Sequence, residues 1–384
     1  MAIAPFRIEV AQSVLDDLQQ RLGLTRYPDA VAGAGWDYGT DLDYLRELVG
    51  YWQSGFDWRA RERELNALAH FRADVDGFGL HFIHQRGNGP RPIPILLSHG
   101  FPDSFLRMVD IIPRLTDPAA HGGEALDAFD VVVPSLPGFG FSDRPSERGF
   151  TVARIADLFA RLMTEELGYT RFAAHGGDWG SGVTEQLALR HAERLVGIHM
   201  TDIPFWRVFG VPAGELSPAE QSFLEQGRRW QRAEGGYNAI QATKPQSLAV
   251  GLNDSPAGLA AWIVEKWRSW SDCGGDVERR FSKDQLLTNV TLYWVTETIH
   301  SACRTYYEAQ HNRLDGTSAR VEVPTAVAIF PKDLVRTPRE YAERFYDIRR
   351  WTEMPRGGHF AALEEPDLLV EDIRAAFRPL RVSS

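Results

Sequence analysis

Apolar and polar residues in the N-terminal part of the chain follow the spacing of helices. Apolar positions recur every three or four residues in VAQSVLDDLQQRLGL (10–24) and in DLDYLRELVGYWQSGFDWRARERELNAL (41–68), as they do on one face of an amphipathic helix. We therefore predict a helical extension over residues 1–72 that packs on the core following it.

The pattern then changes to that of strands. FRADVDGFGLHFIHQRG (71–87) indicates two strands joined at the turn-favouring pair Asp76-Gly77. IPILLSHG (93–100) and FDVVVPSLPG (129–138) contain short apolar strands, which are typical of a sheet covered on both faces.

Helices and strands alternate in the next segment. TVARIADLFARLMTEEL (151–167) is amphipathic, RFAAHGGD (171–178) is a strand running into a turn, SGVTEQLALRHAERL (181–195) is helical, and LVGIHM (195–200) is again a strand. This alternation predicts an α/β fold with a mostly parallel, doubly wound sheet.

A helical segment interrupts the alternation over residues 205–318. It contains the helical stretches LNDSPAGLAAWIVEKWRSW (252–270) and QLLTNVTLYWVTETIHSACRTYYEAQ (285–310). Strands return at VEVPTAVAIFP and DIRRWTEMP, before a last helix in EPDLLVEDIRAAFRPL. We predict an α/β core formed by residues 73–204 and 319–384, with residues 205–318 as a helical cap between the sixth and seventh strands.

Composition narrows the class of protein. The chain has 384 residues and a net charge of −10, and it contains no run of Lys and Arg, so we expect no nucleic-acid partner. No apolar run has the length of a membrane span, and the start does not read as a signal peptide. The only cysteines, Cys273 and Cys303, lack the spacing of a metal site. We expect a soluble, cytoplasmic protein without metal or cofactor.

The stretch HGGDWGSG (175–182) has the form of a sharp strand-to-helix turn that usually presents a nucleophilic serine, but its central residue is Asp178. Attack by a carboxylate on a carbonyl would give an anhydride. Attack on an electrophilic sp3 carbon gives an ester that water can cleave, so an epoxide or an alkyl halide fits. An ordinary loop aspartate beside structural glycines fits less well with a position between strand and helix.

The loop HGFP (99–102) follows an apolar strand and can direct the backbone N–H of Phe101 into the same cleft. With the N–H of Trp179 it would form a two-donor oxyanion hole. His99, Gly100 and Pro102 would support this loop, although the motif alone could be a tight turn.

A general base and an orienting acid are also present. His359, in RGGHFAALEEP after the last strand, can activate water. Asp333, in IFPKD after the preceding strand, suits the chain order nucleophile, acid, histidine. Asp202, in HMTDIP after the sixth strand, is the alternative acid.

Opening an epoxide also needs a proton donor at the ring oxygen, and a neutral phenol can supply it. The cap offers Tyr237, Tyr293, Tyr306 and Tyr307, among which spacing alone does not choose.

Trp262, Trp267 and Trp270, on or near the predicted cap helix, indicate an apolar or aromatic substrate, or simply pack the cap.

The chain resembles the microsomal-type epoxide hydrolases of the α/β-hydrolase fold, including the juvenile-hormone epoxide hydrolases. The resemblance spans almost the whole chain and rests on an ordered set of stretches: FRIEV, LQQRL, RYPD, GLHFIH, HGFPDS, PSLPGFGFS, GGDWGS, TKP, LNDSPAGLAAWIVEKW, LYW and RGGHFAALEEP. The animal enzymes carry a membrane-anchor helix, and we expect this chain to be a soluble member without one.

The resemblance implies Asp178 as nucleophile, His359 as base and Asp333 as acid, at a position where many relatives carry glutamate. It also implies Tyr237 and Tyr306 as the proton donors. Trp262 and Tyr307 are further pocket candidates. The expected partners are a small-molecule epoxide and water, in natural-product biosynthesis or detoxification.

Two other functions are considered. A haloalkane dehalogenase would use the indole N–H of Trp179 for halide, but the side chain of Phe101 offers no second N–H. A non-catalytic ligand-binding member of the fold would normally lack a catalytic residue, and here the whole set is present. The oligomeric state is open, with a homodimer as one option.

Overall fold

The computed structural model describes residues 3–209, 215–312 and 319–381. Within these ranges one nine-stranded sheet has the order β1-β2-β3-β5-β4-β6-β7-β8-β9. The strands are β1 (Ala4–Pro5), β2 (His70–Val75), β3 (Phe78–Gln85), β4 (Ile93–Ser98), β5 (Phe129–Pro134), β6 (Phe172–Gly176), β7 (Leu195–Met200), β8 (Val321–Ile329) and β9 (Tyr346–Glu353).

The sheet is antiparallel at one end and parallel elsewhere. Strands β1, β2 and β3 pair antiparallel, β3 pairs antiparallel with β5, and the six strands from β5 to β9 in sheet order are parallel. The predicted mostly parallel sheet is confirmed, as is the turn at Asp76 and Gly77, both of which have positive φ. The short β1 was not predicted, so the cap segment falls between the seventh and eighth described strands.

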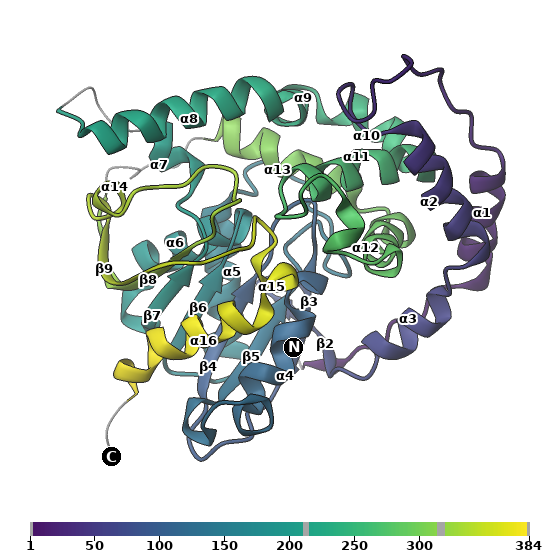
Figure 1. Ribbon diagram of the computed structural model, residues 1–384. Coiled ribbons are helices and arrows are strands. Elements are labelled where there is room, and N and C mark those ends of the chain that lie inside the picture. Colours follow the sequence, from purple (N-terminus) through teal and green to yellow (C-terminus); the bar gives the residue numbers. More distant parts are fainter. Residues whose placement is uncertain (1–2, 210–214, 313–318, 382–384) are drawn as a thin grey trace.

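Helices cover both faces of the sheet (Figure 1). Helices α4 (Ile112–Thr116), α15 (Ala361–Glu364) and α16 (Pro366–Phe377) lie on one face, and α5 (Val152–Arg161) and α6 (Trp179–Arg190) lie on the other. Leu96 of β4 joins one buried cluster, while its neighbours Ile95 and Leu97 join another. Burial on both faces explains why this strand is apolar throughout.

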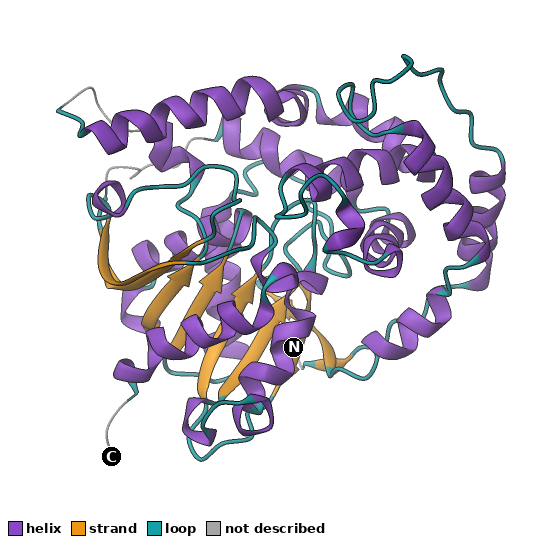
Figure 2. Ribbon diagram, in the orientation of Figure 1, coloured by secondary structure: helices purple, strands orange, loops and turns teal. Residues whose placement is uncertain are grey.

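Further helices lie above the carboxyl ends of the parallel strands and beside the sheet (Figure 2). They are α1 (Gln12–Gly23), α2 (Leu42–Ser54), α3 (Trp58–Leu65), α7 (Phe205–Phe209), α8 (Pro218–Glu234), α9 (Gly236–Thr243), α10 (Pro245–Asp254), α11 (Pro256–Ser269), α12 (Lys283–Thr296), α13 (Ile299–His311) and α14 (Arg339–Ala342). Short 3-10 turns occupy 105–111, 118–121, 125–127, 192–194, 277–279 and 378–380, and a π turn occupies 162–166.

The N-terminal helices contact both parts of the molecule. Trp58 and Leu65 join a cluster with the strand residues Ile83 and Ile95, and α1, α2 and α3 also pack against the cap helices α11 and α12. We propose the division into extension, core and cap on this arrangement. Its outer limits at residues 1 and 384, and the cap limit at 318, lie outside the described residues.

The helical stretch 285–310 is not one helix. Glu297 has a left-handed backbone conformation with φ 52° and ψ 36°, which ends α12, and α13 starts at Ile299. The apolar spacing continues across the break, so the sequence pattern does not reveal it. No helix in the described part of the chain combines the length and the apolar character needed to cross a membrane.

Candidate active site

Asp178 occupies a strained turn between β6 and α6. Its φ of 57° and ψ of −127° are unusual for a residue with a side chain, and such strain costs about 1–3 kcal/mol. A Cβ at Gly180 would collide with the carbonyl of Ser98, and one at Gly100 would collide with the Asp178 carboxylate. The turn thus requires glycine at both contacts, and it presents a carboxylate with 8% of the side chain exposed.

Asp202 supports this turn. Gly176 pairs with Met200 in the parallel register of β6 and β7, so the residues two positions further on lie side by side. Oδ1 of Asp202 accepts hydrogen bonds from the N–H of Asp178 at 2.9 Å and from the hydroxyl of Ser181 at 2.8 Å. Burial and the negative charge of Asp333 raise the pKa of Asp202 to about 6.

His359 lies between two carboxylates. Its Nδ1 is 2.8 Å from Oδ1 of Asp333, and its Nε2 is 3.3 Å from Oδ2 of Asp178 without hydrogen-bond alignment. A parallel bridge between Lys332 and Gly358 sets the acid beside the histidine. Of the two candidate acids, Asp333 contacts the imidazole, and Asp202 holds the nucleophile turn.

The carboxylates dominate the protonation of His359. Burial disfavours the charged ring, but the charge of Asp333 and the contact with Asp178 outweigh burial and raise the pKa of His359 from 6.5 to about 10. The ring therefore carries a proton at neutral pH as long as both carboxylates are charged.

The loop after β4 directs a donor at the nucleophile. The N–H of Phe101 donates to Oδ1 of Asp178 at 2.9 Å. Trp179 begins α6 directly after the nucleophile, and the first N–H groups of a helix have no intrahelical acceptor. Of the two backbone groups predicted to form an oxyanion hole, the Phe101 N–H contacts the Asp178 carboxylate, and the Trp179 N–H lies at the helix start directly after Asp178.

Buried polar contacts hold that loop. The N–H of Gly100 donates to Asp103, and the side chain of Asn289 donates to the carbonyl oxygen of Pro102, each at 2.8 Å. Nε2 of His99 accepts from the N–H of Leu136 at 3.0 Å.

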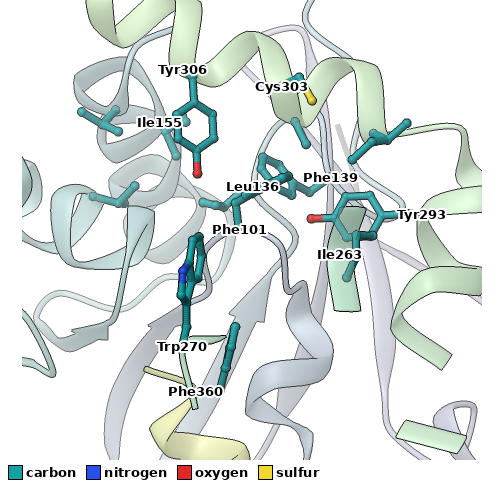
Figure 3. Packing of buried hydrophobic residues seen from close by; sticks show 14 of the residues in the cluster. Phe101, Leu136, Phe139, Ile155, Ile263, Trp270, Tyr293, Cys303, Tyr306 and Phe360 are labelled. Atoms are coloured by element: carbon teal, nitrogen blue, oxygen red, sulfur yellow. The ribbon is translucent and has the colours of Figure 1, made fainter. Parts of the chain in front are cut away.

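Tyr237 of α9 and Tyr306 of α13 meet at this site. Their rings lie edge to face at 5.7 Å, and both contact the ring of Phe101. In Figure 3, Tyr306 projects from α13 toward Phe101 and Trp270. Burial, with further contributions that include the charge of Asp178, raises the pKa of both hydroxyls. They stay protonated and can donate.

Two family models match the chain. The model described as epoxide hydrolase N terminus matches residues 3–108, and the model described as alpha/beta hydrolase fold matches residues 93–366. A protein of Stigmatella aurantiaca (strain DW4/3-1), to which its name ascribes an epoxide hydrolase function, is 45% identical over 380 residues, covering 99% of this chain and 86% of that protein. The chain belongs to the epoxide hydrolases.

Other comparisons agree. Epoxide hydrolase 1 of Sus scrofa is 36% identical over 408 residues, covering 97% of this chain and 88% of that protein. The crystal structure of juvenile hormone epoxide hydrolase from the silkworm Bombyx mori matches with a TM-score of 0.84 and 29% identity, covering 99% of this chain and 94% of that chain. The family resemblance inferred from the sequence and the α/β-hydrolase fold are confirmed.

The other aromatic candidates of this epoxide hydrolase have different surroundings. The hydroxyl of Tyr293 donates to the carbonyl oxygen of Asp103 at 2.6 Å. Tyr307, one position beyond Tyr306 on α13, stacks on His311 and lines a cavity elsewhere, because successive helix residues point in different directions.

The indole N–H of Trp262 donates to Gln241 at 3.1 Å. Among the contacts of the described residues, neither Trp262 nor Tyr307 touches the Asp178 carboxylate, and Trp262 packs against the buried cluster that contains Tyr237 and Tyr306.

Trp270 and Glu364, neither of which was predicted to lie beside His359, link the cap to the loop that carries this histidine. The N–H of His359 donates to the carbonyl oxygen of Trp270 at 2.9 Å, and the Trp270 ring contacts the rings of both His359 and Tyr237. Glu364 accepts hydrogen bonds from the N–H groups of Asp272 at 2.7 Å, Gly358 at 3.0 Å and Phe360 at 2.9 Å.

We call this set, the cap segment 270–272 with the loop 357–360 and Glu364, the base clasp. Only the LEEP stretch after His359 could have drawn attention to Glu364.

Arg107 completes the lower part of the site. Its buried guanidinium donates to Asp103 at 2.7 Å and to the carbonyl oxygen of His359, so it ties the loop after β4 to the loop 357–360, which we call the base loop after the role predicted for His359. Over the ranges the structure describes, no group of three or more His, Cys, Asp or Glu side chains could hold a metal ion.

Proposed function

We propose that this epoxide hydrolase opens an apolar or aromatic epoxide to a vicinal diol through an ester on Asp178, which water activated by His359 then cleaves. The observation that carries the proposal is the arrangement of one carboxylate. Asp178 stands at the apex of the turn, accepts the Phe101 N–H, and lies 3.3 Å from His359 Nε2.

In the first half-reaction an oxygen of Asp178 attacks a ring carbon. The bond from that carbon to the ring oxygen breaks, and its electron pair goes to the oxygen, which takes a proton from Tyr237 or Tyr306. Because burial raises the pKa of both hydroxyls, they stay protonated and donate hydrogen bonds to the ring oxygen until its developing alkoxide is basic enough to take one of the protons.

Ester formation removes the charge of Asp178 and so changes the base. One of the two carboxylates that raise the pKa of His359 is lost, and the pKa of the imidazole falls. The His359 imidazolium then gives its proton to the tyrosinate, which becomes a phenol again. His359 is left neutral and able to accept a proton.

In the second half-reaction His359 takes one proton from water, and the hydroxide attacks Cγ of Asp178. The N–H groups of Phe101 and Trp179 stabilise the oxyanion. The ester bond breaks, the departing diol oxygen takes the remaining water proton, and Asp178 is again a carboxylate beside a protonated His359. Asp333 stabilises the imidazolium without accepting its proton.

A haloalkane dehalogenase is the alternative to exclude by experiment. The indole N–H of Trp179 is buried at the site beside the Tyr306 hydroxyl, and in that position it would suit a halide. Phe101 supplies no second side-chain donor, whereas two hydroxyls face the site, which favours an oxygen leaving group.

The experiment measures three properties of the purified protein: diol formation from styrene oxide, halide release from haloalkanes, and binding of styrene oxide without turnover. We expect conversion of styrene oxide to its diol, no chloride or bromide release from haloalkanes, and loss of turnover in Asp178→Asn. Halide release without diol formation would establish the dehalogenase, and binding of styrene oxide without turnover would indicate a non-catalytic protein.

A further inference from the structure

A cavity away from the Asp178 carboxylate lies at the seam between the core and the cap. Its volume is about 490 Å³. The core contributes the segment around Pro137, Phe150 and Ile155, and the cap contributes the start of α10 with Lys244 and one face of α13. Such seams are common places for small-molecule sites.

Three cationic side chains line this seam cavity without a partner. Arg148 and Lys244 are exposed and Arg304 is half-buried. Over the described residues, none of the three forms an ion pair with a carboxylate. This positive group stands out because the whole chain carries a net charge of −10.

The two carboxylates that also line the cavity are engaged elsewhere. Glu147 pairs with Arg154 at 2.6 Å. Glu308 accepts from the N–H of Gly149 and from the side chain of Asn312, each at 2.7 Å. Because Arg154 offsets the charge of Glu147 and the partners of Glu308 are neutral, Glu308 is the carboxylate left to face the three cations, and the cavity keeps an excess of positive charge.

Arg304 shows the imbalance most clearly. Burial and the neighbouring charge of Arg144 lower its pKa, and Glu308 offsets this only in part. A cation that has lost part of its hydration and has no bonded partner is energetically unfavourable. A bound anion would remove this cost.

The floor of the cavity is apolar. Phe150 and Ile155 are buried, and the ring of Tyr307 forms part of the wall. A fitting ligand has a hydrocarbon body on this floor and a single anionic group at the rim. Arginine and lysine both suit a carboxylate in this role.

We propose that the seam cavity binds a carboxylate on a mainly hydrocarbon molecule. Arg304 and Glu308 are four residues apart and so lie on the same face of α13. Tyr306 is two positions from each of them and therefore lies on the opposite face of this helix. Ile155 lines the cavity and belongs to the same buried cluster as Tyr306. The cavity therefore adjoins the buried cluster that contains both Tyr237 and Tyr306.

Binding is tested with decanoate by calorimetry on the intact protein. We expect binding to the wild type, binding weakened about ten-fold or more in Arg304→Gln and in Lys244→Gln, and weaker binding of decanol. Arg161→Gln is the matched control, because Arg161 is exposed on α5 and pairs with Asp76 outside the cavity. Arg304→Gln should not lower the melting temperature, since no ion pair is lost.

Three results would overturn the proposal: no binding of decanoate, equal affinity for decanoate and decanol, or unchanged affinity in both cavity variants. None of them bears on the proposed epoxide hydrolysis, which is followed separately with styrene oxide.

Kinetics then identify the source of the carboxylate, and this step rests on the proposed function. If the substrate itself carries the group, an epoxydecanoic acid has a lower KM than its methyl ester, Lys244→Gln removes the difference, and decanoate competes with the acid. If a separate molecule binds, decanoate changes kcat for styrene oxide without competing with it.

Discussion

Trp270 and His359 are joined by both backbone and side chain. The N–H of His359 donates to the carbonyl oxygen of Trp270 at 2.9 Å, and the two rings meet edge to face at 5.4 Å. The same Trp270 ring lies 5.1 Å from the ring of Tyr237. One cap residue therefore contacts both the proposed general base, His359, and one of the proposed proton donors, Tyr237.

The base clasp provides a first prediction. Glu364→Gln replaces a carboxylate that accepts three N–H groups with an amide that has a single acceptor oxygen. Burial raises the pKa of Glu364 to about 7, so the test is made above this pH, where the group is charged. We expect ester hydrolysis to slow by about ten-fold or more, because a hydrogen bond to a charged group contributes about 1.5–3 kcal/mol. Ester formation on Asp178, measured by rapid-quench mass spectrometry, should change much less.

Glu365→Gln is the matched control, since Glu365 binds Arg280 and Arg356 instead of the base loop. Equal slowing of both half-reactions in Glu364→Gln would mean that Glu364 only stabilises the fold.

The two acid candidates give a second prediction. Asp333→Asn should lower kcat by about 100-fold or more, because the imidazolium loses the carboxylate that stabilises it. Asp202→Asn should retain most activity, because an asparagine oxygen can still accept from the Asp178 N–H and the Ser181 hydroxyl. Steady-state turnover of styrene oxide by both variants checks this, and the reverse order of activities would make Asp202 the acid.

The turn that carries Asp178 and the two residues proposed to act with it could be predicted from the sequence, because a local sequence pattern indicates each of them. Asp178 lies in a glycine-bounded turn between a strand and a helix, and Asp333 and His359 follow consecutive strands whose carboxyl ends meet at one edge. The links made by Trp270 and Glu364 were not accessible, because they depend on how closely the cap segment approaches the base loop. A Cβ at Gly358 would collide with the backbone of 270–272, and this approach has no local signature. The break at Glu297 was hidden because apolar residues continue on both sides of it.

The tyrosines give a third prediction. Tyr237→Phe and Tyr306→Phe should each slow ester formation by about 10–100-fold, the amount expected for one hydrogen bond to developing charge. The double variant should lose nearly all activity. Tyr307→Phe is the control, since Tyr307 stacks on His311. Stopped-flow measurement of the alkylation step separates these outcomes, and normal alkylation in the double variant would remove the tyrosines from the mechanism.

Protonation of His359 gives a fourth prediction. Its pKa in the folded protein is about 10, compared with an ordinary value of 6.5. The folded state thus binds this proton more tightly. The resulting stability is complete below pH 6.5 and is lost as the pH rises toward 10. In urea unfolding, the stability advantage of the wild type over His359→Gln should shrink across this range.

The effect of the Asp178 charge on the pKa of His359 can be measured directly by nuclear magnetic resonance. Asp178→Asn removes one of the two carboxylates beside His359, so the imidazole pKa should fall relative to the wild type. An unchanged pKa would contradict the idea that ester formation converts His359 into a base.

The covalent ester is the central claim, and a single turnover in H₂¹⁸O tests it most directly. With enzyme in excess over styrene oxide, water attacks Cγ of Asp178, so the label should enter the Asp178 carboxylate while the first diol carries the oxygen that Asp178 donated. Mass spectrometry of the peptide containing Asp178 and of the diol distinguishes the two sites. Label found only in the diol, with none in Asp178, would contradict the account and show that water attacks the epoxide directly.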